Sequence, residues 1–173
     1  MPRIADSNIL AFYHEYDADG CLSNWYASPF TYLRTEFCCS EQAMMWGKAC
    51  VFHAWDTADK ILQTTDQGTI KQLGRSGVPR YDDDLWRKIR RPLMRPILRE
   101  KFLQNDDLRR QLLATGSLVL AEAAPHDSNW GVGLAVDDPR IADLSNWRGT
   151  NLLGWTLMQA NSCRAQMERR NWY

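Results

Sequence analysis

Short apolar runs at three places along the chain predict β-strands. The first is Ile9 to Tyr13, the second is Thr31 to Phe37, and the third is Leu118 to Ala123. The third run is apolar enough to be a buried strand, although it delivers one carboxylate, Glu122, toward the loop that follows. These runs predict a small β-sheet.

Helical periodicity predicts helices along much of the remaining chain. They are expected over Glu41 to Ala54, Thr57 to Thr64, Thr69 to Leu73, from Leu85 onward, over Asp106 to Leu113 and from Leu152 to Met158. The expected class is therefore α+β, a single compact domain that is mostly helical with a small β-sheet. We expect one domain over residues 1–173, with its core at 9–160 and a basic C-terminal tail at 161–173.

Two features of the helix expected from Leu85 onward need separate comment, its prolines and its basic residues. Pro92 and Pro96 predict either a helix that ends near Arg91, with a new one starting at Pro92, or a strong kink. The basic segment from Arg87 to Lys101 is expected to be a solvated face, with some members free to meet an anion.

The stretch from Gly74 to Gly77 is predicted to be a flexible turn. It is not a P-loop, because the G-x-x-x-x-G-K-[ST] pattern is missing. It could present Arg75 and backbone N–H groups to a phosphate, or Arg75 could be an ordinary surface residue.

The helix that starts near Ser40 combines an apolar face with two opposite charges. Ser40 is expected to be its N-cap, and Glu41 suits the positive end of the helix dipole. At about 100° per residue, Glu41, Met45 and Lys48 share one face. Either the two charges form a salt bridge at the rim of the core, or the face lines a pocket.

Two loops carry further candidate side chains. Ser23 and Asn24 offer hydrogen-bonding groups beside Trp25, whose flat face could pack in the core or stack on a base. After the third strand, a loop holds a second acid, a tryptophan and glycines, an arrangement common in active sites. Its candidates are Asp127, Trp130 and Gly131, and Asn151 lies in a later loop segment.

Charge and composition narrow the possible partners. Hydrophobic residues make up 45%, and Lys+Arg and Asp+Glu both total 21, so the formal net charge is zero. This balance argues against a general nucleic-acid or membrane-surface binder, although a local basic patch remains possible.

Cysteine and histidine usage gives no sign of a metal site or a disulfide framework. The five cysteines form no C-x-x-C pair, and the three histidines are far apart in sequence. There is no run of about 18 apolar residues. We therefore expect a soluble cytoplasmic protein with no metal site and no membrane partner.

Ordered motifs along the chain carry a resemblance to a known family. They are F-Y (Phe12, Tyr13), L-S-N-W (Leu22 to Trp25), S-E-Q-A-M-M-x-x-K-A (Ser40 to Ala49), L-G-R (Leu73 to Arg75), W (Trp86), K-F-x-Q-N (Lys101 to Asn105), L-L-A-T-G (Leu112 to Gly116), A-E-A-x-P-x-D-x-x-W-G-x-G (Ala121 to Gly133), W-R-G-x-N-L-L-G (Trp147 to Gly154) and L-M (Leu157, Met158). Over roughly Ile9 to Ala160 the chain resembles the NADAR family, the YbiA-like N-glycosidases. This resemblance implies a continuous helix where Pro92 and Pro96 occur.

The resemblance implies hydrolysis of a ribosyl C–N bond without a cofactor. One branch of the family splits ribosylaminopyrimidine 5′-phosphates of riboflavin biosynthesis into ribose 5-phosphate and the free aminopyrimidine, and another removes ADP-ribose from guanine bases of nucleic acid. The family's functional acids and aromatic match Glu41, Trp86 and Asp127, with Lys48 and Glu122 at further motif positions. A non-catalytic module that binds NAD or ADP-ribose is the third alternative, and a nucleic-acid partner is expected only for the guanine branch.

These residue types suit the chemistry. Breaking the C–N bond builds positive charge on the sugar, which one carboxylate stabilises while another activates water. Lys48 could hold a phosphate, orient Glu41 or attack the opened sugar as an amine nucleophile. The catalytic candidates are Glu41, Lys48, Glu122 and Asp127, and the substrate-binding candidates are Ser23, Asn24, Trp25, Arg75, Trp86, Trp130, Gly131 and Asn151.

Overall fold

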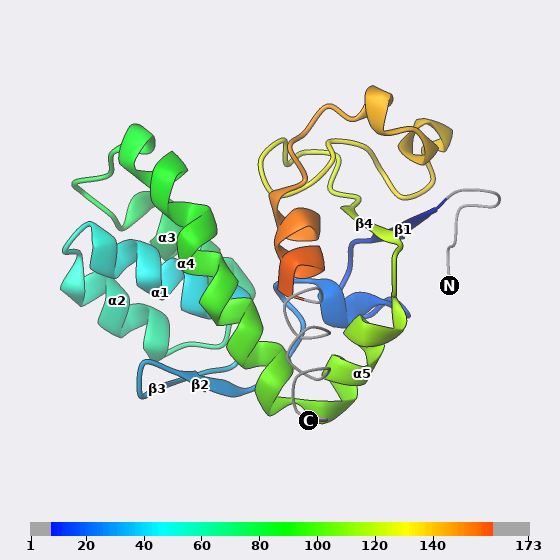
Figure 1. Ribbon diagram of the computed structural model, residues 1–173. Coiled ribbons are helices and arrows are strands. Elements are labelled where there is room, and N and C mark those ends of the chain that lie inside the picture. Colours follow the sequence, from blue (N-terminus) through cyan, green and yellow to red (C-terminus); the bar gives the residue numbers. More distant parts are fainter. Residues whose placement is uncertain (1–7, 161–173) are drawn as a thin grey trace. The chain divides into compact units, whose positions relative to one another are not determined.

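The polypeptide forms two units, seen in a computed structural model that describes residues 8–160 (Figure 1). Unit 2 is one continuous stretch, residues 24–105, and unit 1 takes the chain on both sides of it, residues 1–23 and 106–173. The predicted basic tail at 161–173 lies outside the described residues. The proposed domain limits stay a prediction.

Unit 2 is mainly helical. Its elements are β2 (Phe30–Tyr32), β3 (Thr35–Phe37), α1 (Ser40–Val51), α2 (Trp55–Leu62), α3 (Gln67–Ser76) and α4 (Asp83–Gln104). Helix α1 contacts α2, α3 and α4, so it is the central helix of this unit (Figure 1). Side chains on α1 are therefore surrounded by the unit's other helices.

Unit 1 combines a parallel strand pair with short helices. Its described elements are β1 (Ile9–Phe12), the 3₁₀ helix η1 (Gly20–Leu22), α5 (Asp106–Ala114), β4 (Val119–Glu122), η2 (Pro139–Ala142), η3 (Leu144–Asn146) and a helix over residues 152–160. Strand β1 pairs in parallel with β4, with Ile9 opposite Val119 and Phe12 opposite Glu122. The α+β class and the predominance of helix are confirmed, but the strands form two small sheets where one was predicted.

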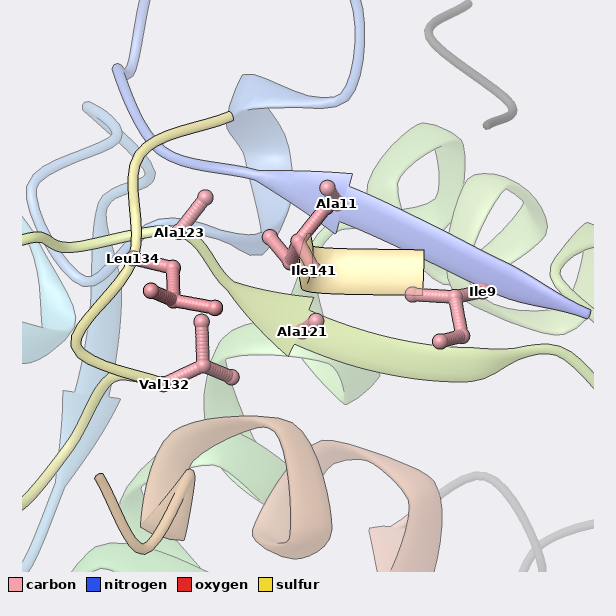
Figure 2. Close-up of a cluster of buried hydrophobic side chains, with 7 residues drawn as sticks. All are labelled: Ile9, Ala11, Ala121, Ala123, Val132, Leu134 and Ile141. Atoms are coloured by element: carbon pink, nitrogen blue, oxygen red, sulfur yellow. The ribbon is translucent and has the colours of Figure 1, made fainter. Parts of the chain in front are cut away.

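The core of unit 1 is built around the parallel pair. All four residues of β1 are buried, which explains why its sequence is a continuous apolar run and does not alternate. Figure 2 shows the cluster that the two strands form with the segment that follows them. Its members are Ile9, Ala11, Ala121, Ala123, Val132, Leu134 and Ile141.

The strand predicted over Thr31 to Phe37 is in fact an antiparallel hairpin. Leu33 and Arg34 form its turn, both with positive φ, and Phe30 pairs with Phe37. Such two-residue turns usually carry Asn or Gly because those residues adopt positive φ easily. Leu-Arg offers no such signal, so the sequence pattern does not indicate the turn.

Helix α1 starts and ends differently from the prediction. Cys39 is its N-cap, and Ser40 is the first helical residue. The helix stops at Val51 because His53 has positive φ and the Ala54 amide returns to the carbonyl of Ala49, a typical helix-ending arrangement. Glu41 does lie in the first turn, as expected.

Helix α4 is continuous through both prolines, as the family resemblance implies, so the first of the two alternatives, a division into two helices, is wrong. Pro92 and Pro96 lie one turn apart in this helix. Pro92 has no N–H group, so the carbonyl of Lys88, four residues earlier, loses its helical hydrogen bond, and both residues are exposed. Water can satisfy a carbonyl on that face. The buried residues Met94, Ile97, Leu98 and Phe102 hold the helix on its other side.

The basic segment on α4 is not wholly solvated, contrary to the prediction. Lys101 is fully buried, and its Nζ lies 5.2 Å from the ring centroid of Phe102 and 5.8 Å from that of Tyr26. Two other members pair with acids: Arg87 with Asp83, and Arg99 with Glu100. The segment therefore presents less free positive charge than its sequence indicates.

Candidate active site

The face of α1 that carries Lys48 is closed by helix α3. Lys48 is 8% exposed, and its Nζ donates a hydrogen bond of 2.7 Å to the carbonyl oxygen of Gly74. A Cβ on Gly74 would lie 2.0 Å from the sulfur of Met45, so a side chain there would force Met45 or the helices to shift where α3 crosses α1. Met45 and Lys48 thus meet the same residue of α3, as expected for one shared helix face.

Two aromatic rings surround the Lys48 ammonium. Nζ lies 4.4 Å from the ring centroid of Tyr81 and 5.5 Å from that of Trp86. Both distances are within the range of a cation–π interaction. Trp86, a predicted candidate on α4, is 6% exposed. Tyr81 is not among the predicted candidates, because it precedes the helix and no spacing relates it to Lys48.

Burial and charge together set the protonation of Lys48. Burial lowers the pKa of Lys48 from its usual 10.5, and the nearby positive charge of Arg75 lowers this pKa further. The carboxylates of Glu41 and Asp83 oppose the change by favouring the ammonium. Lys48 is therefore a better source of neutral amine near neutral pH than an exposed lysine.

Arg75 belongs to a helix and not to a loop. Helix α3 includes Gly74, Arg75 and Ser76 and ends at Gly77, whose amide bonds to the carbonyl of Leu73. The alternative in which backbone N–H groups here bind an anion is wrong, because α3 already uses that backbone in its helix. The Arg75 side chain is exposed and remains available for an anion.

The loop with Ser23, Asn24 and Trp25 joins the two units in sequence. Within unit 2, Asn24 holds the start of α1: its backbone oxygen accepts from the Glu41 amide at 2.9 Å, and its side-chain oxygen accepts from the Ser40 hydroxyl at 3.2 Å. Ser23 and Asn24 are buried, and Trp25 is half-buried. Asn24 thereby fixes the turn of α1 that carries Glu41.

In unit 1, Glu122 ends strand β4 beside Asn151. The Asn151 side chain accepts from the Glu122 amide at 3.1 Å and donates to the carbonyl of Leu120 at 2.8 Å. Asn151 is fully buried with positive φ, a conformation that asparagine tolerates well. Its amide group therefore acts on the backbone of β4, which positions Glu122.

Asp127 organises the loop that follows β4. One oxygen of its carboxylate accepts from the backbone amides of Asn129 and Trp130, each at 2.8 Å. Gly131 is buried at the end of this loop, and a Cβ there would lie 2.7 Å from that of Ala124. Asp127 and Trp130 are half-buried, so both side chains remain partly accessible.

Each unit thus gathers its own set of candidates. In unit 2 these are Glu41, Lys48, Arg75 and Trp86, joined by Tyr81, and in unit 1 they are Glu122, Asp127, Trp130, Gly131 and Asn151. Among residues 8–160, no group of three or more His, Cys, Asp or Glu side chains could hold a metal ion. The first set offers an amine with a lowered pKa, a carboxylate and two aromatic faces, which suits attack on an electrophilic carbon.

Comparisons with known proteins relate this chain to N-glycosidases. The NADAR domain model matches residues 11–164, which spans both units. The chain is 33% identical to Protein irg-1 of Caenorhabditis elegans over 95% of its length and 89% of that protein. It is 37% identical to N-glycosidase R617 of Acanthamoeba polyphaga mimivirus, covering 72% of each. It is also 35% identical to Riboflavin biosynthesis protein VVA0006 of Vibrio vulnificus, over 70% of this chain and 32% of that protein.

A solved structure shares the fold. The NMR structure of the Escherichia coli protein YbiA aligns with a TM-score of 0.76 and 27% sequence identity, covering 92% of this chain and 86% of YbiA. In the part of the chain that the structure describes, none of the helices has the length and apolar character needed to cross a membrane.

Proposed function

The chain belongs to the NADAR family and is an enzyme that acts on N-glycosyl bonds, and we propose that it cleaves phosphorylated ribosylaminopyrimidines into ribose 5-phosphate and the free aminopyrimidine. The naming of a relative as a riboflavin biosynthesis protein supports this substrate class. The observation that carries the proposal is the buried Lys48 amine between Tyr81 and Trp86.

Lys48 acts as the nucleophile. The nitrogen lone pair of the ribosylamine expels the ring oxygen and forms an imine at the anomeric carbon. The neutral Lys48 amine adds to that carbon, and the aminopyrimidine leaves as its nitrogen takes up a proton, giving a Schiff base on Lys48. Water then adds to the same carbon, the amine leaves, and the sugar closes as ribose 5-phosphate.

The carboxylates move protons in this sequence. Glu41, in the same helix as Lys48, accepts the proton that the amine sheds on attack and returns it to the leaving nitrogen. On their family motif positions alone, Glu122 and Asp127 are proposed as the further acids that stabilise the cationic sugar and activate water. From the sequence motifs, Trp86 and Trp130 are proposed to stack on the base or sugar, and Arg75 to bind the 5′-phosphate.

The Schiff base can be tested directly. Sodium borohydride added during turnover is expected to reduce the imine and attach the ribose phosphate to Lys48, detectable by peptide mass spectrometry. Lys48→Arg keeps the charge and is expected to show no adduct. If the wild-type protein gives no adduct while product forms, Lys48 is not the nucleophile.

Glu41 has its own test. Glu41→Gln keeps the shape of the side chain but cannot move a proton, so turnover is expected to fall about 100-fold or more. The circular dichroism spectrum should be unchanged. Turnover near the wild-type rate would remove Glu41 from the mechanism.

The alternative substrate is ADP-ribosylated guanine in nucleic acid. Its support is the basic segment on α4, but Lys101 is buried and Arg87 and Arg99 are paired with acids. The enzyme should therefore release ribose 5-phosphate from a ribosylaminopyrimidine phosphate faster than ADP-ribose from a modified guanine oligonucleotide. The reverse order would reassign the substrate. N-glycosidases among the relatives favour catalysis over the non-catalytic binding module.

A further inference from the structure

The Tyr81 ring lies against the Lys48 amine, although the residue is 42% exposed. Its hydroxyl donates to the carboxylate of Asp83 at 2.7 Å, and its ring packs against Phe52 with centroids 5.3 Å apart. Asp83 is in turn 3.4 Å from the Nε of Arg87. The ring is thus anchored at its hydroxyl end and along its side, with Nζ of Lys48 4.4 Å from its centroid.

We propose that Tyr81 is a positioning residue that holds the Lys48 amine in place and sets its proton affinity through the face of its ring. The electron-rich face attracts an ammonium more than a neutral amine, so it favours the protonated form. Tyr81 thereby counteracts the effects of burial, keeping Lys48 from losing its proton too readily.

The effect of Tyr81 on the protonation of Lys48 comes on top of the effects of the charged groups around it. Glu41 on α1 and Asp83 on α4 favour the ammonium, Arg75 on α3 disfavours it, and the Gly74 carbonyl accepts one of its hydrogens. The Tyr81 ring is neutral, because burial and the bond to Asp83 raise the pKa of its hydroxyl to about 12. Its contribution therefore depends on the ring and does not change with pH until the Tyr81 hydroxyl titrates near its pKa of about 12.

A labelling experiment measures this contribution without any substrate. Trace acetylation of the full chain at a series of pH values, followed by peptide mass spectrometry, gives the pH midpoint for reaction of Lys48. Tyr81→Leu removes the ring, so the midpoint is expected to fall by roughly half a pH unit. Tyr81→Phe keeps the ring and should stay near the wild-type midpoint. The matched control is Tyr16→Leu, since Tyr16 is 76% exposed and stacks on His14.

A second series keeps the ring, with Tyr81→Phe as its reference because every member lacks the hydroxyl bond to Asp83. Phenylalanines with increasing numbers of ring fluorines, placed at position 81, keep the ring shape but weaken its negative face. The Lys48 midpoint is expected to fall steadily along this series. An unchanged midpoint, either here or in a folded Tyr81→Leu variant, overturns the role of Tyr81.

The inference rests on the proposed function only for its effect on turnover. If Lys48 is the nucleophile, the acidic limb of kcat/KM shifts in Tyr81→Leu by the same amount as the labelling midpoint. If the labelling midpoint shifts while the kinetic limb does not, Tyr81 tunes Lys48 as proposed but Lys48 is not the nucleophile. Failure of the Tyr81 inference and failure of the proposed role of Lys48 as nucleophile are therefore distinguishable.

Discussion

Lys48 illustrates a conflict between stability and chemistry at the scale of one residue. A buried amine is costly to protonate, and this same cost raises the fraction of neutral amine that the proposed nucleophilic role requires. In the unfolded chain Lys48 has the ordinary pKa of 10.5, whereas in the folded chain the pKa is lower. Below the folded pKa the penalty is fully present, and it is relieved as the pH rises toward 10.5.

This linkage predicts how Lys48→Met changes stability. Methionine removes the charge at similar length, so the variant is expected to be more stable at pH 7, by up to about 1 kcal/mol. Its advantage should shrink as the pH rises through the folded pKa of Lys48, because the wild type then loses its penalty. Urea unfolding of both proteins at several pH values measures this difference. A difference that is constant from neutral pH to pH 10.5 would contradict the lowered pKa of Lys48.

Single residues also show how far the sequence could predict the candidate site. Helical spacing alone places Glu41 and Lys48 on one face, because the period of a helix is fixed. It could not find Tyr81 or the Gly74 carbonyl, which reach Lys48 only through the packing of α3 and α4 against α1. The two glycines that flank Arg75 indicate a loop, yet Gly74 is there for close helix packing.

At the scale of elements, the crossing of α1 and α3 depends on a missing side chain. Gly74→Ala would place a Cβ 2.0 Å from the sulfur of Met45, so the helices or Met45 must shift. We expect a loss of about 1–3 kcal/mol in the free energy of unfolding. Turnover should also fall, because the carbonyl that holds Lys48 moves with the helix.

Helix α3 supplies its own control for this substitution. A Cβ on Gly68 would have room, since its nearest neighbour would be an oxygen of Asp66 at 3.4 Å. Gly68→Ala should therefore stabilise the protein by about 0.5 kcal/mol through helix propensity. Urea denaturation and turnover assays on both variants compare the two sites. Equal effects of the two substitutions would show that the helix crossing does not constrain position 74.

A second prediction at the scale of elements concerns the stability cost of the prolines in α4. Pro92 is exposed inside the helix, so Pro92→Ala restores a hydrogen bond without removing core packing. We expect the free energy of unfolding to rise by about 1–3 kcal/mol. Thermal and urea unfolding test this, with the exposed Arg95→Ala as the control. A destabilised Pro92→Ala would mean that the helix requires proline there.

The elements themselves were predictable where one signal dominates. Strand β1 is a pure apolar run. Helix α4 follows a run of three aspartates, Asp82 to Asp84, a typical helix-start signal, and Asp82 caps it by accepting a 2.9 Å bond from the Leu85 amide. Prediction failed where packing outweighs a local preference. The buried face of α4 keeps it helical through two prolines, and Leu33 and Arg34 turn the hairpin without a turn sequence.

At the scale of the whole molecule, charge neutrality bears on the choice of substrate. The formal net charge is zero, so long-range attraction for a polyanion is weak. Turnover of a ribosylaminopyrimidine phosphate should change less than about threefold between 50 and 200 mM salt, because only one phosphate group is bound. Steady-state rates measured across that range test this. A fall of about 1,000-fold would instead indicate a substrate held through many phosphates.

The parallel pairing in unit 1 has a consequence for biosynthesis. The Asn8 side chain bonds to the carbonyl of Ser117, 109 positions later, and β1 has no partner until β4 has been made. All of unit 2 lies between β1 and β4 in the sequence, so it is synthesised before β4. During translation the apolar segment Ile9–Phe12 therefore stays unpaired until β4 has been synthesised. In that interval chaperones can bind this segment while the protein is still on the ribosome.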